Sequence, residues 1–169
     1  MKVVLYMAMT VNGMIARENY QEDFLSHENW KVLLKLAKKY GGIIVGRKTY
    51  QTVQQWKEYN FDDVKATKII VSHNSKLKLP QSYLLASSPL KALQKSFQLG
   101  FRKVLLVGGS TLNSAFLKRG LINEIIVNIE PYILGRGIPI FAGSGFERRL
   151  KLIKVIKLKR GIIQLNYKV

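Results

Sequence analysis

The chain has 169 residues, of which 47% are apolar, so it is long enough and apolar enough to fold as a globular protein. The absence of cysteine excludes disulfides and thiolate metal sites, and the two histidines belong to no cluster with metal-ligand spacing. A formal net charge of +18, from 28 basic and 10 acidic residues, makes the chain strongly cationic.

The first half of the chain alternates apolar runs with helical patterns. Residues 2–9 predict a strand, and Asn12-Gly13 after them is a strong turn signal. A helix is predicted to begin after Ser26, a candidate N-cap, and to end at Gly41. The next apolar run predicts a strand that leaves into a polar turn, with a second helix over residues 51–56.

The second half continues this alternation up to the tail. Its predicted strands are residues 68–71, 82–87, 104–107 and 123–130, the last followed by Pro131. One helix is predicted to begin near Pro89, and another to follow residue 107 with Ser110 or Thr111 as its cap. The tail predicts two strands that meet near Arg160-Gly161, because its β-branched residues outweigh the helical spacing of its lysines.

Alternating strands and helices predict an α/β fold with a mostly parallel central sheet, flanking helices and an antiparallel C-terminal edge. No repeat, linker or low-complexity tract interrupts the sequence, so we expect a single domain over residues 1–169. No apolar run reaches membrane-spanning length, and the N-terminus does not resemble a secretion signal. We therefore expect a cytoplasmic protein without a membrane partner.

The pair Gly108-Gly109 lies between a predicted strand and a predicted helix. Glycine costs conformational entropy, so two in succession indicate a special demand on the backbone. A strand, a glycine turn and a helix N-terminus together present free N–H groups to an anion. A tight turn without a ligand explains this pair equally well.

Three apolar strands end in polar residues suited to phosphate, namely residues 46–49 (GRKT), 72–74 (SHN) and 108–111 (GGST). The carboxyl ends of parallel strands lie on one edge of a sheet, where ligands of open α/β sheets bind. Arg47 offers a bidentate fork and Lys48 a point charge. Jointly, the three strand ends favour a dinucleotide or a similar phosphate ligand.

The high positive charge has three explanations: attraction of an anionic small molecule, binding of nucleic acid or a membrane surface, and a lysine-rich composition. We favour composition. The sequence contains no recognised nucleic-acid motif and no interleaving of aromatic and basic residues of the stacking kind. A nucleic-acid partner is therefore not favoured.

These segments together resemble the superfamily of dihydrofolate reductase and the riboflavin-pathway pyrimidine reductases. "MAMTVNGMIA" resembles its first strand and nicotinamide loop, "VGRKTY" its Gly-Arg-x-Thr turn, and residues 104–141 the late segment of the pyrimidine reductases. The resemblance implies a dihydrofolate-reductase-like fold and NADPH as cofactor. By position, it implies cofactor contacts at Ala8, Ile15, Gly46, Arg47, Lys48, Thr49, Ser72, His73, Gly108, Gly109, Ser110, Thr111 and Leu112.

The chain departs from the resemblance where a proton donor is expected. Dihydrofolate reductases place an acid at the start of the first helix, but a count without gaps back from Gly46 puts Trp30 there. The pyrimidine reductases usually carry an Asp-x-Pro segment after the second strand, which is missing here. The catalytic candidates are therefore Glu28 in the first helical turn, Asp23 in the preceding loop, and Asn128 near the family's substrate-side threonine.

The resemblance implies an oxidoreductase that transfers a hydride from NADPH to a C=N bond of a small heterocycle. Dihydrofolate is the first expected substrate and a ribosylaminopyrimidine of the riboflavin pathway the second. A cofactor-binding protein without turnover is the alternative of a different class, favoured by the missing acid. We also keep a homodimer open as the assembly.

Overall fold

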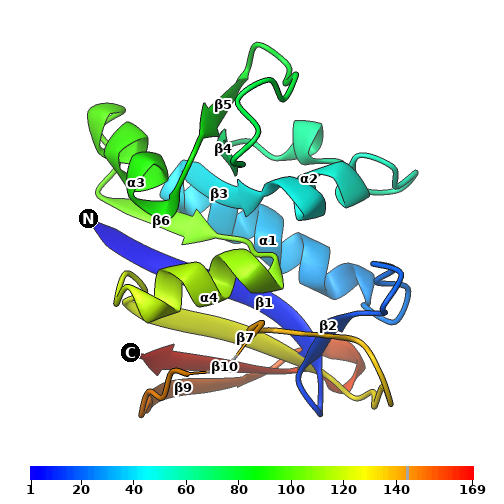
Figure 1. Ribbon diagram of the computed structural model, residues 1–169. Helices are drawn as coiled ribbons and strands as arrows, with labels where there is room; N and C mark the ends of the chain where they lie inside the picture. The colour runs from blue at the N-terminus through cyan, green and yellow to red at the C-terminus, as the bar shows by residue number, and fades with distance from the viewer. Residues whose placement is uncertain (144) are drawn as a thin grey trace.

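The computed structural model describes residues 1–143 and 145–169 and folds them around an eight-stranded sheet (Figure 1). The order across this sheet is β5-β4-β3-β6-β1-β7-β10-β9. Its strands are β1 (Lys2–Thr10), β3 (Gly42–Gly46), β4 (Thr67–Val71), β5 (Tyr83–Ala86), β6 (Lys103–Leu106), β7 (Glu124–Glu130), β9 (Lys151–Lys157) and β10 (Ile163–Lys168). Neighbours from β5 to β7 run parallel, and β10 and β9 add an antiparallel edge. The predicted α/β architecture is confirmed.

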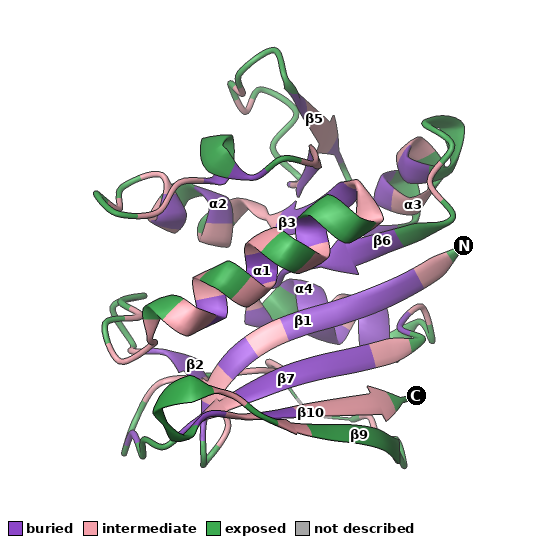
Figure 2. Ribbon diagram, turned by 180° about the vertical axis from the view of Figure 1, so that it is seen from behind, coloured by how far each residue is buried: buried purple, intermediate pink, exposed green. Residues whose placement is uncertain are grey.

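Helices cover both faces of the sheet. They are α1 (His27–Tyr40), α2 (Arg47–Val53), α3 (Pro89–Gln98) and α4 (Ser110–Lys118). Seen from behind, α1 crosses in front of the sheet, while α4 lies on the opposite face (Figure 2). Strand side chains alternate between the two layers, so that Val4 packs with Leu33 and Ala37 of α1, and Leu5 with Phe116 of α4.

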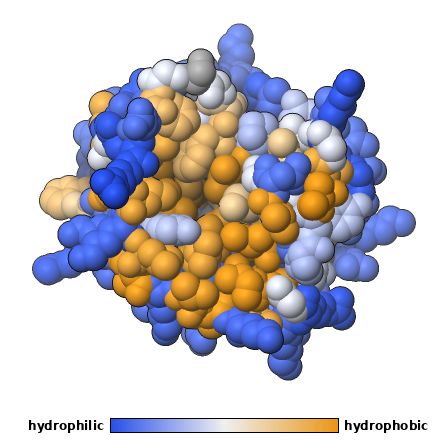
Figure 3. Space-filling view, turned by 90° about the horizontal axis from the view of Figure 1, so that it is seen from below, coloured by the Kyte–Doolittle hydropathy of each residue, from blue (hydrophilic) through white to orange (hydrophobic). Residues whose placement is uncertain are grey.

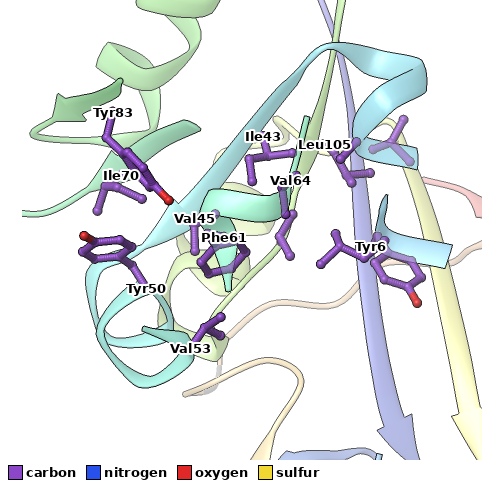
Figure 4. Close-up of a cluster of buried hydrophobic side chains, with 14 of the residues drawn as sticks. Tyr6, Ile43, Val45, Tyr50, Val53, Phe61, Val64, Ile70, Tyr83 and Leu105 are labelled. Atoms are coloured by element: carbon purple, nitrogen blue, oxygen red, sulfur yellow. The ribbon is translucent and has the colours of Figure 1, made fainter. Parts of the chain in front are cut away.

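The core on the α1 side also includes the short helix α2 and the 3₁₀ turn η1 (Phe61–Asp63). Figure 4 shows this cluster, in which Val45 of β3 lies beside the buried ring of Phe61. Ile43, Ile44 and Val45 are all fully buried because helices cover both faces of the parallel strands. This packing fixes the carboxyl ends of β3, β4 and β6 against one another.

The second helix differs from the prediction. α2 begins at Arg47, directly after β3, rather than at residue 51, and it ends at Val53. Its buried residues are Tyr50 and Val53, which are three positions apart and lie on one helical face. The polar first turn therefore belongs to the helix, although its sequence looks like an isolated turn.

The helix caps also differ in part from the prediction. α4 begins at Ser110 with Gly109 at its N-cap, so neither Ser110 nor Thr111 caps it. Ser26 does occupy the N-cap position of α1, but its side chain makes no cap hydrogen bond. Its backbone N–H instead donates to Glu130 at 2.8 Å. A residue of β7 thus anchors the start of α1.

The tail folds as the two predicted antiparallel strands, joined by the 3₁₀ turn η2 (Lys159–Gly161). β9 is an edge strand whose apolar side chains Leu152, Ile153 and Val155 are exposed. It lies at the lower side of the molecule in Figure 1, and the view from below shows a broad apolar area (Figure 3). Within residues 1–143 and 145–169, no helix has the length and apolar character needed to cross a membrane.

Candidate active site

The three polar strand ends meet in one hollow, which we call the strand-end cavity. It has a volume of about 520 Å³ and lies beyond the carboxyl ends of β3, β4 and β6. The short strands β2 (Met14–Ala16) and β8 (Ile138–Pro139), which pair with each other, close another side. All predicted cofactor contacts line this cavity except Ala8 and Gly108.

The two adjacent glycines bring the ends of β3 and β6 close together. Gly108 has a φ of 85°, in the left-handed region that favours glycine, and a cis peptide bond joins it to Gly109. The N–H of Gly46 donates to the carbonyl of Gly108 at 2.7 Å. A Cβ at Gly109 would lie 2.7 Å from Oγ1 of Thr49. The fold thus gives the pair a packing role, while Gly109 also borders the strand-end cavity.

The wall of the strand-end cavity suits an anionic group. The Ser110 hydroxyl, in the first turn of α4, is buried without a hydrogen-bond partner. A buried hydroxyl is normally satisfied, so a ligand acceptor would complete it. Arg47 and Lys48 supply positive charge at the rim, and no carboxylate among the described residues pairs with either. Lys48 donates instead to the hydroxyl of Tyr20 at 3.1 Å.

A second hollow of about 570 Å³, the aromatic cavity, adjoins the first and is lined by α1, the loop of residues 21–26 and the segment 56–61. The rings of Trp30 and Tyr59 have centroids 5.1 Å apart, and Trp56 meets Tyr59 edge-on at 6.3 Å. The buried hydroxyl of Ser26, which lines this cavity, has no partner within the described structure. Flat aromatic walls with a few polar atoms suit a small heterocycle.

A buried polar network supports the floor of the aromatic cavity. The side-chain amide of Asn29 donates to the carboxylate of Glu130, and its oxygen accepts from Asn128 at 2.9 Å. The Tyr6 hydroxyl donates to the backbone carbonyl of Asn29 at 2.8 Å and accepts from Asn128 at 3.1 Å. Burial first, and then the negative charge of Glu130, raises the pKa of Tyr6 above its ordinary value. The network therefore fixes the first turn of α1.

The structure does not bring the three predicted catalytic residues together. Asp23 lines the aromatic cavity, Asn128 is buried beneath it, and Glu28 lies outside both cavities, 3.9 Å from Nζ of Lys31. Asp23 accepts two hydrogen bonds from the guanidinium of Arg17, at 2.6 and 3.1 Å, and this contact lowers the pKa of its carboxyl. No group of three metal-binding side chains lies close enough together, within residues 1–143 and 145–169, to hold a metal ion.

The sequence did not single out Glu22, which the structure brings to the boundary of the two cavities. The residues that line both hollows are Ile15, Glu22, Thr49 and Gly109. Glu22 is the acid of this set; it is half-buried, and loss of hydration at this position raises its pKa to about 8. Its loop has no regular period, so no sequence signal distinguishes it from its neighbours Glu18 and Asp23.

Comparisons with known proteins agree with this architecture. The protein YwjB of Bacillus subtilis (strain 168) is 27% identical over 170 residues, covering 98% of this chain and 97% of its own length. A putative riboflavin biosynthesis protein from Shewanella sp. PV-4 has a similar structure, with a TM-score of 0.79 and 22% identity over 99% of this chain and 98% of that one.

A third similar structure comes from Thermotoga maritima and is described as a diaminohydroxyphosphoribosylaminopyrimidine deaminase/5-amino-6-(5-phosphoribosylamino)uracil reductase. Its TM-score is 0.77 at 16% identity, and the match covers 99% of this chain but 56% of that one. These likenesses confirm the fold expected from the resemblance. A family model described as the RibD C-terminal domain matches residues 1–164, so the chain belongs to the RibD C-terminal domain family.

Proposed function

We propose that this protein is a nicotinamide-dinucleotide-dependent reductase acting on a C=N bond of a ribosylaminopyrimidine, as in riboflavin biosynthesis. The observation that carries the proposal is the contact between two dissimilar cavities. One is lined by polar strand ends and by the cationic side chains of Arg47 and Lys48, and the other by aromatic rings. The two cavities meet at Ile15, Glu22, Thr49 and Gly109. A reductase needs such an arrangement, because cofactor and substrate must touch at one point.

The chain's own residues fit a dinucleotide in the strand-end cavity. The first turn of α4, with the unpartnered hydroxyl of Ser110, suits the diphosphate. Arg47, Lys48, Ser72 and His73 line the same cavity and suit the additional phosphate of NADPH. When bound, the reduced cofactor supplies the hydride. The protein's share is to orient both partners and to exclude water.

The aromatic cavity favours a pyrimidine over dihydrofolate, which becomes the second candidate. The face of α1 that borders this cavity carries Asn29, Trp30 and Leu33, without an acid. A dihydrofolate reductase would place its acid on that face. The Thermotoga maritima protein, whose description includes a 5-amino-6-(5-phosphoribosylamino)uracil reductase, has the same fold. Family and cavity chemistry thus point to the same class of substrate.

The test follows oxidation of NADPH with 5-amino-6-(5-phosphoribosylamino)uracil, its dephosphorylated form and dihydrofolate. We expect turnover with a pyrimidine and none with dihydrofolate. Turnover with dihydrofolate alone would replace the pyrimidine assignment. Tight NADPH binding without turnover of any substrate would favour a cofactor-binding protein, and failure to bind a dinucleotide would refute the proposal.

A further inference from the structure

Glu22 lies where the two cavities meet, at the place where a reaction between their ligands would occur. It borders both the strand-end cavity and the aromatic cavity, where a hydride acceptor and its donor would have to meet. We propose that the carboxyl group of Glu22 donates the proton that completes the reduction, a role that rests on the proposed function. It replaces Glu28, which lies outside both cavities.

Arg17 holds the residues on both sides of Glu22, one through its backbone and the other through its side chain. The N–H of Arg17 donates to the carbonyl of Gln21 at 2.8 Å, and its guanidinium holds the carboxylate of Asp23. The carbonyl of Glu22 itself accepts from the N–H of Leu25 at 3.0 Å. The loop is thus anchored at Gln21, Glu22 and Asp23. Within residues 1–143 and 145–169, the carboxyl of Glu22 has no hydrogen bond or ion pair, so it remains available to a substrate.

Neighbouring charges are not what shifts the pKa of Glu22. The charged or titratable side chains that line the aromatic cavity are Tyr6, Asp23, Lys57, Glu58 and Tyr59, and those that line the strand-end cavity are Tyr20, Arg47, Lys48 and His73. Asp23 is engaged by Arg17, and Lys48 by Tyr20. Loss of hydration is the cause that acts on Glu22, and it raises the pKa to about 8. The raised pKa of Glu22 favours the protonated carboxyl at neutral pH, although the residue is half-buried rather than fully enclosed.

This protonation state suits an acid catalyst and separates Glu22 from Asp23. A general acid works best when its pKa lies near the working pH. Contact with Arg17 lowers the pKa of Asp23, which is therefore an anion at neutral pH and has no proton to give. Tyr6 already donates its hydroxyl proton to the carbonyl of Asn29. The acids that line the aromatic cavity are Glu22, Asp23 and Glu58, and of these Glu22 alone also borders the strand-end cavity, where the hydride donor would lie.

The chemical step balances with one carboxyl proton. The carbon of the substrate C=N bond accepts the hydride, and the π electron pair of that bond moves to the nitrogen. The nitrogen then takes the proton from Glu22, which becomes a carboxylate and regains a proton from water. The net change is one hydride and one proton added across C=N, with the dinucleotide oxidised.

The test compares wild-type protein with Glu22→Gln, and with Glu18→Gln as a matched control in the exposed part of the same loop. The first readout needs no cofactor: carbon NMR of glutamate labelled at its side-chain carboxyl, titrated across neutral pH. We expect a carboxyl with a pKa of about 8 in the wild type and in Glu18→Gln, and its loss in Glu22→Gln. Absence of such a resonance from the wild type would refute the assignment.

The second readout is single-turnover hydride transfer to the pyrimidine. The wild-type rate should fall about tenfold per pH unit above the pKa of Glu22, because the carboxyl loses its proton there. Glu22→Gln should lower the rate at neutral pH by about a hundredfold or more and remove this pH dependence, with NADPH affinity and thermal unfolding unchanged. Glu18→Gln should behave as the wild type.

The outcomes separate this inference from the proposed function. A wild-type protein that reduces the pyrimidine, together with a Glu22→Gln variant that keeps the wild-type rate and pH profile, would overturn the role of Glu22 and leave the function intact. A wild-type protein that reduces no pyrimidine would overturn the function, and the NMR titration would still report whether Glu22 is a protonated carboxyl at neutral pH.

Discussion

The contact between Gly109 and Thr49 predicts a specific coupling between two substitutions. A Cβ at Gly109 would lie 2.7 Å from Oγ1 of Thr49, closer than such atoms approach in real structures. Thr49 is β-branched and has little rotational freedom to give way. Overpacking of this kind costs about 1–3 kcal/mol. We therefore expect Gly109→Ala to lower the free energy of unfolding by about that amount in the wild-type background.

A Thr49→Ala background removes Oγ1, the atom that a Cβ at Gly109 would meet. There, Gly109→Ala should cost at least about 1 kcal/mol less, which a double-mutant cycle measured by urea unfolding would report as coupling. Costs common to both backgrounds cancel in this cycle. Equal costs in the two backgrounds would refute the packing explanation of the glycine. Dinucleotide titration of the double variant then tests the other explanation, because a backbone in contact with a ligand would lose affinity even where folding is relieved.

Two further predictions concern the cofactor and the buried network. NADPH should bind at least about tenfold tighter than NADH, because a charge-assisted contact to the additional phosphate is worth about 1.5–3 kcal/mol. Arg47→Ala should remove most of this preference. Equal affinities of the wild type for both dinucleotides, measured by fluorescence titration, would argue against a 2′-phosphate site. Asn128→Leu leaves the side-chain oxygen of Asn29 and the Tyr6 hydroxyl without their donor. It should lower the free energy of unfolding by about 1–3 kcal/mol, and an unchanged denaturation midpoint would contradict the network.

Local sequence carries much of this fold. The apolar runs that became β3, β4 and β6 are recognisable because strands buried on both faces need continuous apolar residues. The sequence alone places the polar residues after them at one edge of the sheet, because parallel strands end at the same edge, and these residues line the strand-end cavity. The β-branched tail was similarly sufficient to predict the antiparallel edge of β9 and β10. Each of these inferences uses a pattern contained within a few neighbouring residues.

The features that only the tertiary structure decided depend on distant segments. Ser26 is recognisable as an N-cap position, but its N–H is held by Glu130, more than a hundred residues away, and its hydroxyl is left to the aromatic cavity. Glu22, Asp23 and Glu28 are similar acids within seven positions of one another. Contact with Arg17 stabilises the ionised carboxyl of Asp23, Glu28 lies near Lys31, and Glu22 is partly desolvated where the two cavities meet. The proton affinity of a carboxyl depends on the water and charge around it, and in this chain the fold, not the local sequence, sets both.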